Sequence, residues 1–339
     1  MDKRLATLSS WLSNDLELSI TSLEPASADA SFRRYFRVSI ATTNQSKLPK
    51  TFIAMDSPPE HEDNALFVRC TKKLANCGLH VPIIYEQNLS KGFLLISDLG
   101  VKVYQSALNS ESADELYSDA MQALIKMQAA THSSKTSENS HITPTYNKEK
   151  LNSEIQLFND WFIQHYHKTK LSKSELTSMQ QISELLIDSA LQQPQVLVHR
   201  DYHCRNLLIT EQNNPGIIDY QDMVIGPITY DLVSLFKDCY IEWPKQRVNT
   251  WVQEFQKRSR QSGIHAYDNQ EQWLQWFDWM GIQRHLKVLG IFSRLYYRDD
   301  KDQYLQDIPL TYKYLLETSK NYEELAPLTE ILLKYPIKH

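Results

Sequence analysis

One short segment constrains the fold of this 339-residue chain more than any other. Residues 199–206 read HRDYHCRN, which places a histidine, an aspartate and an asparagine in the pattern H-x-D-x-x-x-x-N. The apolar run VLV precedes this segment, and LLITEQNNPGII follows it, reading as a strand, a turn and a second strand that ends at Asp219. A hairpin of that length brings Asp219 back beside Asn206. We therefore expect Asp201, Asn206 and Asp219 to gather at one place.

These three side chains have the chemistry that phosphoryl transfer requires. A carboxylate must accept the proton of the attacking hydroxyl or orient that hydroxyl, and Asp201 stands where such a base is expected. Mg²⁺ prefers oxygen ligands, and Asn206 and Asp219 offer a neutral and an anionic oxygen. The alternative is that His199 and Asp201 belong to a surface turn and that Asn206 caps a helix. The flanking apolar strands and the hairpin spacing favour the first interpretation.

The motifs HRDYHCRN, IIDYQD and GPITYDL together resemble the aminoglycoside phosphotransferase and choline kinase superfamily, which has a protein-kinase-like fold. The resemblance implies Asp201 as the catalytic base, Asn206 and Asp219 as ligands of Mg²⁺, and ATP as the co-substrate. It implies that His199 and Asp231 support the site structurally, although Asp231 is equally well interpreted as a helix N-cap. Further substrate contacts are expected from Arg205 and Asp222, in addition to Asp201.

A closer resemblance extends over nearly the whole chain. DASFRRYFRV, MDSPPE, GFLLISDLG, HRDYHCRNLL, IDYQD and QRHLKVLGIFSRLYYRD are similar to segments of bacterial anomeric kinases of N-acetylmuramate and N-acetylglucosamine. Those enzymes act in the recycling of cell-wall peptidoglycan. The resemblance implies transfer of the γ-phosphoryl group of ATP to the C1 hydroxyl of an amino sugar.

The pattern of apolar residues predicts an α+β fold with two lobes. Residues 1–100 read as a small antiparallel sheet with one helix, and residues 101–339 as a mainly helical lobe. The predicted strands cover residues 33–40, 51–55, 81–87 and 92–100, and the predicted helix covers 60–77 and ends at Gly78. In the helical lobe the clearest periodicity lies at residues 115–130, and residues 131–145 read as a loop. We expect the nucleotide to bind in a cleft between the lobes.

The nucleotide-binding residues are harder to assign, because the chain has no G-x-G-x-x-G loop. SADASFRRYFRV stands at the expected place, and its small residues can approach phosphates through backbone N–H groups. Guanidinium groups bind phosphate well, so an arginine of this segment is expected to contribute. The segment FLLISDLG is expected to hold adenine through its backbone. The candidates are Ser31, Phe32, Arg33, Arg37, Ile96, Ser97, Asp98 and Leu99.

Met55 stands where kinases of this fold usually carry the lysine that steadies the α and β phosphates. A thioether cannot replace that cation, so either an arginine substitutes or nucleotide binding is weak. This departure keeps a pseudokinase-type binding protein open as an alternative. An aminoglycoside or another small alcohol remains an alternative acceptor. A protein kinase is disfavoured by the missing glycine-rich loop and the missing A-P-E segment.

Two features of the C-terminal lobe have competing interpretations. Four basic residues fall on one side of a predicted helix, where they suit an anionic sugar but more often form a solvated face or pair with acids: Arg284, Lys287, Arg294 and Arg298. An aromatic cluster could stack on a sugar, but core packing is the favoured interpretation: Trp273, Trp276, Phe277 and Trp279.

Composition narrows the class of protein. The formal net charge is −5, so the basic excess of a nucleic-acid-binding protein is missing. The four cysteines form no C-x-x-C pair, which argues against a zinc site and favours a reduced protein. No run of apolar residues is long enough to cross a membrane, and the first residues do not read as a secretory signal. We expect a cytoplasmic protein without a nucleic-acid or membrane partner.

Overall fold

The computed structural model describes all residues except 1, 29–31, 42–48, 134–142 and 338–339. The chain forms two compact units. The first contains Met1–Lys102 and Leu208–Gln221, and the second contains Val103–Leu207 and Asp222–His339. The first unit therefore includes a segment from the middle of the chain. A single boundary at residue 100, as the sequence predicts, does not include this segment.

The first unit is built on a five-stranded sheet with the order β1-β2-β3-β5-β4, in which every neighbouring pair is antiparallel. The strands are β1 (Ile20–Ala28), β2 (Arg34–Ile40), β3 (Thr51–Asp56), β4 (Ile84–Asn88) and β5 (Phe93–Ser97). Four of them match the predicted strands. Strand β1 was not predicted, because Pro25 and its polar neighbours hide the strand pattern.

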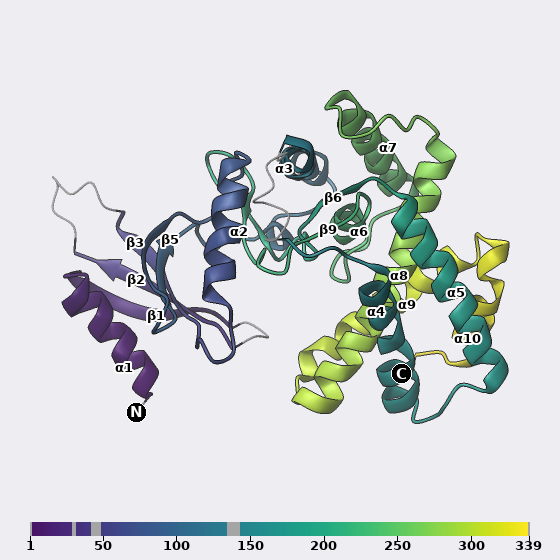
Figure 1. Ribbon diagram of the computed structural model, residues 1–339, viewed down its shortest axis with the longest axis horizontal. Helices are drawn as coiled ribbons and strands as arrows, with labels where there is room; N and C mark the ends of the chain where they lie inside the picture. The colour runs from purple at the N-terminus through teal and green to yellow at the C-terminus, as the bar shows by residue number, and fades with distance from the viewer. Residues whose placement is uncertain (1, 29–31, 42–48, 134–142, 338–339) are drawn as a thin grey trace. The chain divides into compact units, whose positions relative to one another are not determined.

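Two α-helices of the described residues accompany the sheet, whereas the apolar pattern predicts one. Helix α1 (Lys3–Ser10) continues into the short π-helix η1 (Trp11–Asp15), and together they contribute Leu8, Trp11 and Leu12 to a core cluster with apolar residues of the strands. Helix α2 (Asn64–Asn76) begins at the cap residue Asp63 and ends before Gly78, whose φ of 74° favours glycine. Figure 1 shows α1 and α2 on opposite sides of the sheet.

The segment Leu208–Gln221 is bonded into the first unit. It contains most of the two-stranded sheet of β7 (Leu207–Leu208) and β8 (Gly216–Ile217). Its contacts are Ile209 N–H to the Lys102 carbonyl at 2.7 Å, Ile217 N–H to the His80 carbonyl at 2.8 Å, and the Tyr220 hydroxyl to Thr71 Oγ1 at 2.9 Å. The last contact fastens the end of the segment to α2.

The second unit is mainly helical, with one antiparallel pair formed by β6 (Gln195–Val198) and β9 (Val224–Pro227). Its α-helices are α3 (Ala113–Ser133), α4 (Lys148–Leu157), α5 (Lys173–Gln192), α6 (Tyr230–Phe236), α7 (Lys245–Gln261), α8 (Gln270–Asp299), α9 (Ile308–Ser319) and α10 (Ala326–Lys334). The short elements are η2 (Tyr104–Ser106), η3 (Phe158–Tyr166), η4 (Asp302–Asp307) and η5 (Glu323–Leu325). The predicted fold class, an antiparallel sheet followed by a mainly helical lobe, is confirmed.

Helix α8 is the central helix of the second unit. It contacts α4, η3, α5, α6, α7 and α9, and its residues are almost all buried from Trp276 to Ser293. A helix that is covered on every side must bury its polar residues as well as its apolar ones. The aromatic cluster at its start is buried, with 0% of Trp273 and 7% of Trp279 exposed, which confirms the core interpretation.

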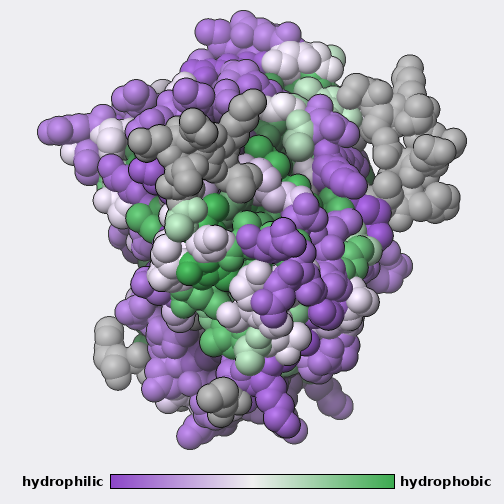
Figure 2. Space-filling view, turned by 90° about the vertical axis from the view of Figure 1, so that its left-hand side faces the viewer, coloured by the Kyte–Doolittle hydropathy of each residue, from purple (hydrophilic) through white to green (hydrophobic). Residues whose placement is uncertain are grey.

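The surface shown in Figure 2 is mostly hydrophilic, with hydrophobic side chains gathered near its centre. The exposed apolar side chains of the first unit include Phe32, Ile83 and Val101. In the described part of the chain, no helix combines the length and the apolar character that crossing a membrane requires.

Candidate active site

The segment 199–206 is a loop that follows strand β6, and a buried carboxylate holds its start. Asp231, in the first turn of α6, accepts hydrogen bonds from the backbone N–H groups of His199 at 2.7 Å and Arg200 at 2.9 Å. Arg200 has a φ of 78°, a conformation that a non-glycine residue adopts only when its surroundings stabilise it. The N-cap of α6 is Thr229, so the carboxylate of Asp231 serves the loop and does not cap its own helix.

Asp201 is held through its backbone, while its carboxylate points to no donor. The carbonyl of Asp201 accepts hydrogen bonds from His203 N–H and from Asn206 Nδ2, both at 3.0 Å. No hydrogen bond to its carboxylate comes from the residues that the structure describes. Burial raises the pKa of Asp201, but the cations Lys287 and Arg284 more than offset this, so its pKa lies below the ordinary value. The arrangement presents an ionised carboxylate that can accept a hydrogen bond from a substrate.

The two predicted metal ligands lie in different units, Asn206 in the second and Asp219 in the first. The amide nitrogen of Asn206 donates to the Asp201 carbonyl, so the amide oxygen is the atom of this side chain that suits a metal ion. Asp219 has a φ of 64°, and one of its carboxylate oxygens accepts a hydrogen bond from Gln221 Nε2 at 2.8 Å. An amide oxygen and a carboxylate oxygen fit Mg²⁺, which prefers hard ligands.

A buried cluster of charges lies against the loop within the second unit. Glu154 of α4 contacts Arg200 Nη2 at 2.5 Å and Lys287 Nζ at 3.3 Å, and it accepts a hydrogen bond from the hydroxyl of Tyr146. Lys287 also donates to the hydroxyl of Tyr230 at 2.9 Å. Burial raises the pKa of Glu154, but the cations Lys287 and Arg200 lower it by more than burial raises it. The pKa therefore lies below the ordinary value, and this carboxylate is ionised. Glu154 was not predicted as part of the site, because no motif surrounds it.

The basic residues of α8 do not share one environment. Arg298 is exposed and bonds Asp299, and Lys287 pairs with Glu154, as the favoured interpretation expected. Arg294 is half-buried. For Arg284 that interpretation was wrong, because this side chain is only 6% exposed and has no acid in contact. The signal that could have found it is the largely apolar sequence around it in the middle of α8, which predicts burial of that stretch on every side.

The other predicted substrate-binding residues differ in how far they are engaged. The guanidinium of Arg205 lies 3.5 Å from the ring centre of Tyr240 and donates to Gln105 Oε1 at 2.9 Å. Asp307 lies 4.0 Å from the same group. Asp222 is exposed.

The arginines predicted to bind nucleotide are paired with acids inside the first unit. Arg33 contacts Glu62 at 2.5 Å. Arg37 donates to both carboxylate oxygens of Asp98, at 2.7 and 3.0 Å, and so connects β2 to the segment after β5. Strand alternation alone does not reveal these partners.

The remaining nucleotide candidates occupy varied environments. Ile96 is buried in β5, and Ser97 Oγ accepts a hydrogen bond from Ile83 N–H at 2.9 Å. Leu99 is half-buried, Phe32 is exposed, and Ser31 lies outside the described residues. Met55 is fully buried in β3, so its side chain is part of the core.

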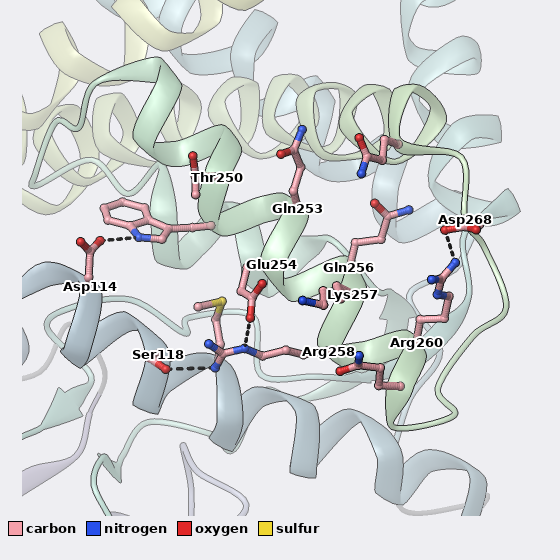
Figure 3. Close-up of a pocket in the computed structure, with 14 residues that line it drawn as sticks. Asp114, Ser118, Thr250, Gln253, Glu254, Gln256, Lys257, Arg258, Arg260 and Asp268 are labelled. Atoms are coloured by element: carbon pink, nitrogen blue, oxygen red, sulfur yellow. Dashed lines mark hydrogen bonds and ion pairs between the residues drawn. The ribbon is translucent and has the colours of Figure 1, made fainter.

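A pocket elsewhere in the second unit contains none of these residues (Figure 3). It lies between α3, α7 and the start of α8. Its polar side chains bond one another: Trp251 Nε1 donates to Asp114 at 2.8 Å, and Arg258 contacts Glu254 at 2.8 Å and Ser118 at 3.0 Å. The candidate active site is therefore distinct from this pocket.

The fold resembles solved kinases. The chain superposes on aminoglycoside phosphotransferase APH(2'')-Ib bound to ADP with a TM-score of 0.59 and 16% identity, covering 94% of this chain and 99% of the other. For choline kinase LicA from Streptococcus pneumoniae the TM-score is 0.62 and the identity 13%, with 93% and 100% covered. At these identities the likeness establishes the fold alone.

Sequence relatives are much more similar. N-acetylmuramate/N-acetylglucosamine kinase of Pseudomonas putida is 40% identical over 98% of this chain and 96% of its own length. The kinases of the same name from Pseudomonas aeruginosa and Neisseria meningitidis are 40% and 35% identical, over 99% and 98% of this chain and 98% and 96% of their own lengths. The profile of the phosphotransferase enzyme family matches residues 22–277. The expected family resemblance is confirmed, and this chain belongs to the phosphotransferase enzyme family.

Proposed function

We propose that this protein is an ATP- and Mg²⁺-dependent kinase that phosphorylates the anomeric hydroxyl of N-acetylmuramate and N-acetylglucosamine. The observation that carries the proposal is the half-buried Asp201, an ionised carboxylate that accepts no hydrogen bond from the described residues. The near full-length relatives that bear this activity in their name support the choice of acceptor. Because ATP is the donor, we assign the reaction to the cytoplasm.

Asp201 would act on the acceptor hydroxyl. Its carboxylate accepts a hydrogen bond from this hydroxyl and directs the oxygen toward the γ-phosphorus. The bond between that oxygen and phosphorus forms, the bond between the γ-phosphorus and the β,γ-bridging oxygen breaks, and ADP leaves. The hydroxyl proton passes to Asp201. Because the transition state is loose and the oxygen gains little positive charge early, a carboxylate with a low pKa is a sufficient base.

Asn206 and Asp219 are the residues we propose as ligands of Mg²⁺. When bound, the ion neutralises negative charge on the phosphate oxygens. The backbone of Ile96, Ser97, Asp98 and Leu99 is proposed to hold adenine, and Ser31, Phe32, Arg33 and Arg37 to lie at the phosphates. Arg33 and Arg37 are paired with Glu62 and Asp98, so phosphate would have to share them with these acids. Arg205 and Asp222 remain proposed contacts of the sugar.

The charges around Asp201 argue against a polycationic acceptor such as an aminoglycoside. Lys287 and Arg284 are the two largest sources of positive potential at Asp201. A cationic acceptor would meet repulsion from both, whereas a neutral or anionic sugar would not.

The test measures ATP consumption with N-acetylmuramate, N-acetylglucosamine, an aminoglycoside and choline, with and without Mg²⁺. We expect turnover with the two amino sugars, and a product that no longer reacts as a reducing sugar, because phosphate on C1 blocks the reducing end. Asp201→Asn should lower kcat by about 10²–10⁴-fold, the usual contribution of a positioned base. Asp188→Asn, at an exposed position of α5, is the matched control and should retain wild-type turnover. A product that keeps its reducing end, or an active Asp201→Asn variant, would refute the proposal.

A further inference from the structure

Arg284 is a buried cation that forms no ion pair in the part of the chain that the structure describes. It lies on α8 with 6% of its surface exposed. Its guanidinium lies over the ring of Tyr230, 5.6 Å from the ring centre, and no hydrogen bond or ion pair joins it to a described residue. Burying a charge without a partner is costly, so such groups are normally paired.

The neighbouring cations show that this part of the unit can supply counter-ions. Lys287, one turn further along α8, lies 3.3 Å from Glu154, and Arg200 lies 2.5 Å from the same carboxylate. Glu154 is thus the shared counter-ion of two cations, Lys287 and Arg200. Arg284 is the third cation in this region and forms no ion pair with a described carboxylate. An anionic group from outside the chain would complete its coordination.

The position of Arg284 points to the acceptor as the source of that group. Tyr230, whose ring the guanidinium covers, directly precedes Asp231, which binds the backbone of the 199–206 loop. Arg284 is therefore tied to the element that holds Asp201. The electrostatics agree with this placement. Burial raises the pKa of Asp201, whereas Lys287 and then Arg284 are the cations that lower this pKa most.

We propose that Arg284 binds the carboxylate of an acidic amino-sugar acceptor and so determines the preference for N-acetylmuramate over N-acetylglucosamine. This inference rests on the function proposed above. The two sugars differ by a lactic acid ether, which gives N-acetylmuramate a carboxylate that N-acetylglucosamine lacks. A guanidinium can bind a carboxylate through two parallel hydrogen bonds. Lys287 is already engaged by Glu154 and Tyr230, which leaves Arg284 for the substrate.

The experiment compares the two sugars in wild type, Arg284→Gln and Arg284→Lys. We expect Arg284→Gln to lower kcat/KM for N-acetylmuramate by about 30-fold or more, mainly through KM, because a buried charge pair is lost. For N-acetylglucosamine we expect a decrease of only about threefold, through the weaker field at Asp201. Arg284→Lys should recover part of the loss, since it restores the charge without the planar fork.

Two controls separate this role from a general effect. Arg294→Gln removes a half-buried cation ten positions further along the same helix and should change neither sugar's kcat/KM by more than about twofold. The primary amide of N-acetylmuramate, which lacks the negative charge, should lose only about threefold in kcat/KM in Arg284→Gln, as N-acetylglucosamine does. Binding of both sugars is also measured by thermal shift, which does not depend on turnover.

The outcomes distinguish the inference from the function on which it rests. If wild type phosphorylates neither amino sugar and neither shifts its Tm, the proposed function fails and the inference fails with it. If wild type is active but Arg284→Gln affects both sugars equally, or leaves N-acetylmuramate unaffected, only the inference is overturned. An equal loss in kcat for both sugars would identify Arg284 as a support for Asp201 or for the transferred phosphoryl group.

Discussion

The carboxylate of Asp231 accepts a hydrogen bond from the backbone N–H of His199 over 2.7 Å, across 32 positions of the sequence. The same carboxylate accepts a second bond from Arg200, so the start of the loop that carries Asp201 depends on one buried acid. Burial raises the pKa of Asp231 to about 6, although His199 and the two backbone bonds act in the opposite direction.

We expect activity to fall as the pH falls through about 6. Below this value Asp231 is protonated, and one of its oxygens becomes a donor where a backbone N–H requires an acceptor. The effect on stability has the opposite sign. Since the folded pKa of Asp231 is raised above the ordinary 3.8, its contribution to stability is complete below 3.8 and is lost as the pH rises through about 6. Profiles of kcat and Tm against pH measure both trends.

Asp231→Asn is the matched variant for the pH profile. Its kcat should no longer fall as the pH decreases through about 6, and it should be lower than that of wild type at every pH. Burial lowers the pKa of His203 to about 3 and that of His265 to about 4, so neither ring titrates in this range. An acid limb near pH 6 that survives in Asp231→Asn would show that another group controls the profile.

Glu154→Gln should destabilise the fold by about 3–5 kcal/mol, because it leaves the buried cations Arg200 and Lys287 without their shared counter-ion. Chemical denaturation measures this change in the free energy of unfolding. Glu242→Gln breaks a surface pair with Lys313 and should cost less than about 1 kcal/mol. Equal effects of the two substitutions would mean that the buried cluster contributes no more than a surface pair.

Two glycines of α8 should respond in opposite ways to alanine. A Cβ on Gly290 would lie 2.4 Å from the backbone of Leu157, so Gly290→Ala must separate α8 from the end of α4. The expected cost is about 2–4 kcal/mol, since overpacked cores shift their backbone. A Cβ on Gly281 meets nothing closer than 3.8 Å, so Gly281→Ala should stabilise the helix by up to about 1 kcal/mol. Thermal unfolding of both variants tests the close approach of α8 to the backbone of Leu157. An unchanged Tm of Gly290→Ala would contradict it.

Removal of divalent metal with a chelator should abolish turnover, and Mg²⁺ should restore it. Asn206→Ala and Asp219→Ala should each raise the Mg²⁺ concentration for half-maximal activity by about 10–100-fold, because each removes an oxygen ligand. Glu211→Gln, at an exposed position between the two, is the control and should leave the Mg²⁺ requirement as in wild type. Unchanged Mg²⁺ dependence in both ligand variants would refute the assignment.

The parts of the molecule that follow from local pattern were predictable from the sequence. Strand β2 alternates buried and half-buried residues, β3 and β5 are short apolar runs, and α2 ends before Gly78. The 199–206 loop was recognisable from its residue types at fixed spacing. The interactions of Arg33, Arg37 and Glu154 were not predictable. Their partners lie far away in sequence, and a side chain's position on a strand or helix does not reveal which acid will face it.

The passage of residues 208–221 through the first unit determines when that unit can complete its folding during synthesis. The carbonyls of His80 and Lys102 receive their hydrogen bonds from Ile217 and Ile209, which the ribosome adds more than a hundred residues later. A nascent chain that ends at residue 102 therefore has its sheet residues but leaves these acceptors to water. Assembly of the first unit must wait until much of the helical unit has been translated, and neither unit can be obtained as a contiguous fragment.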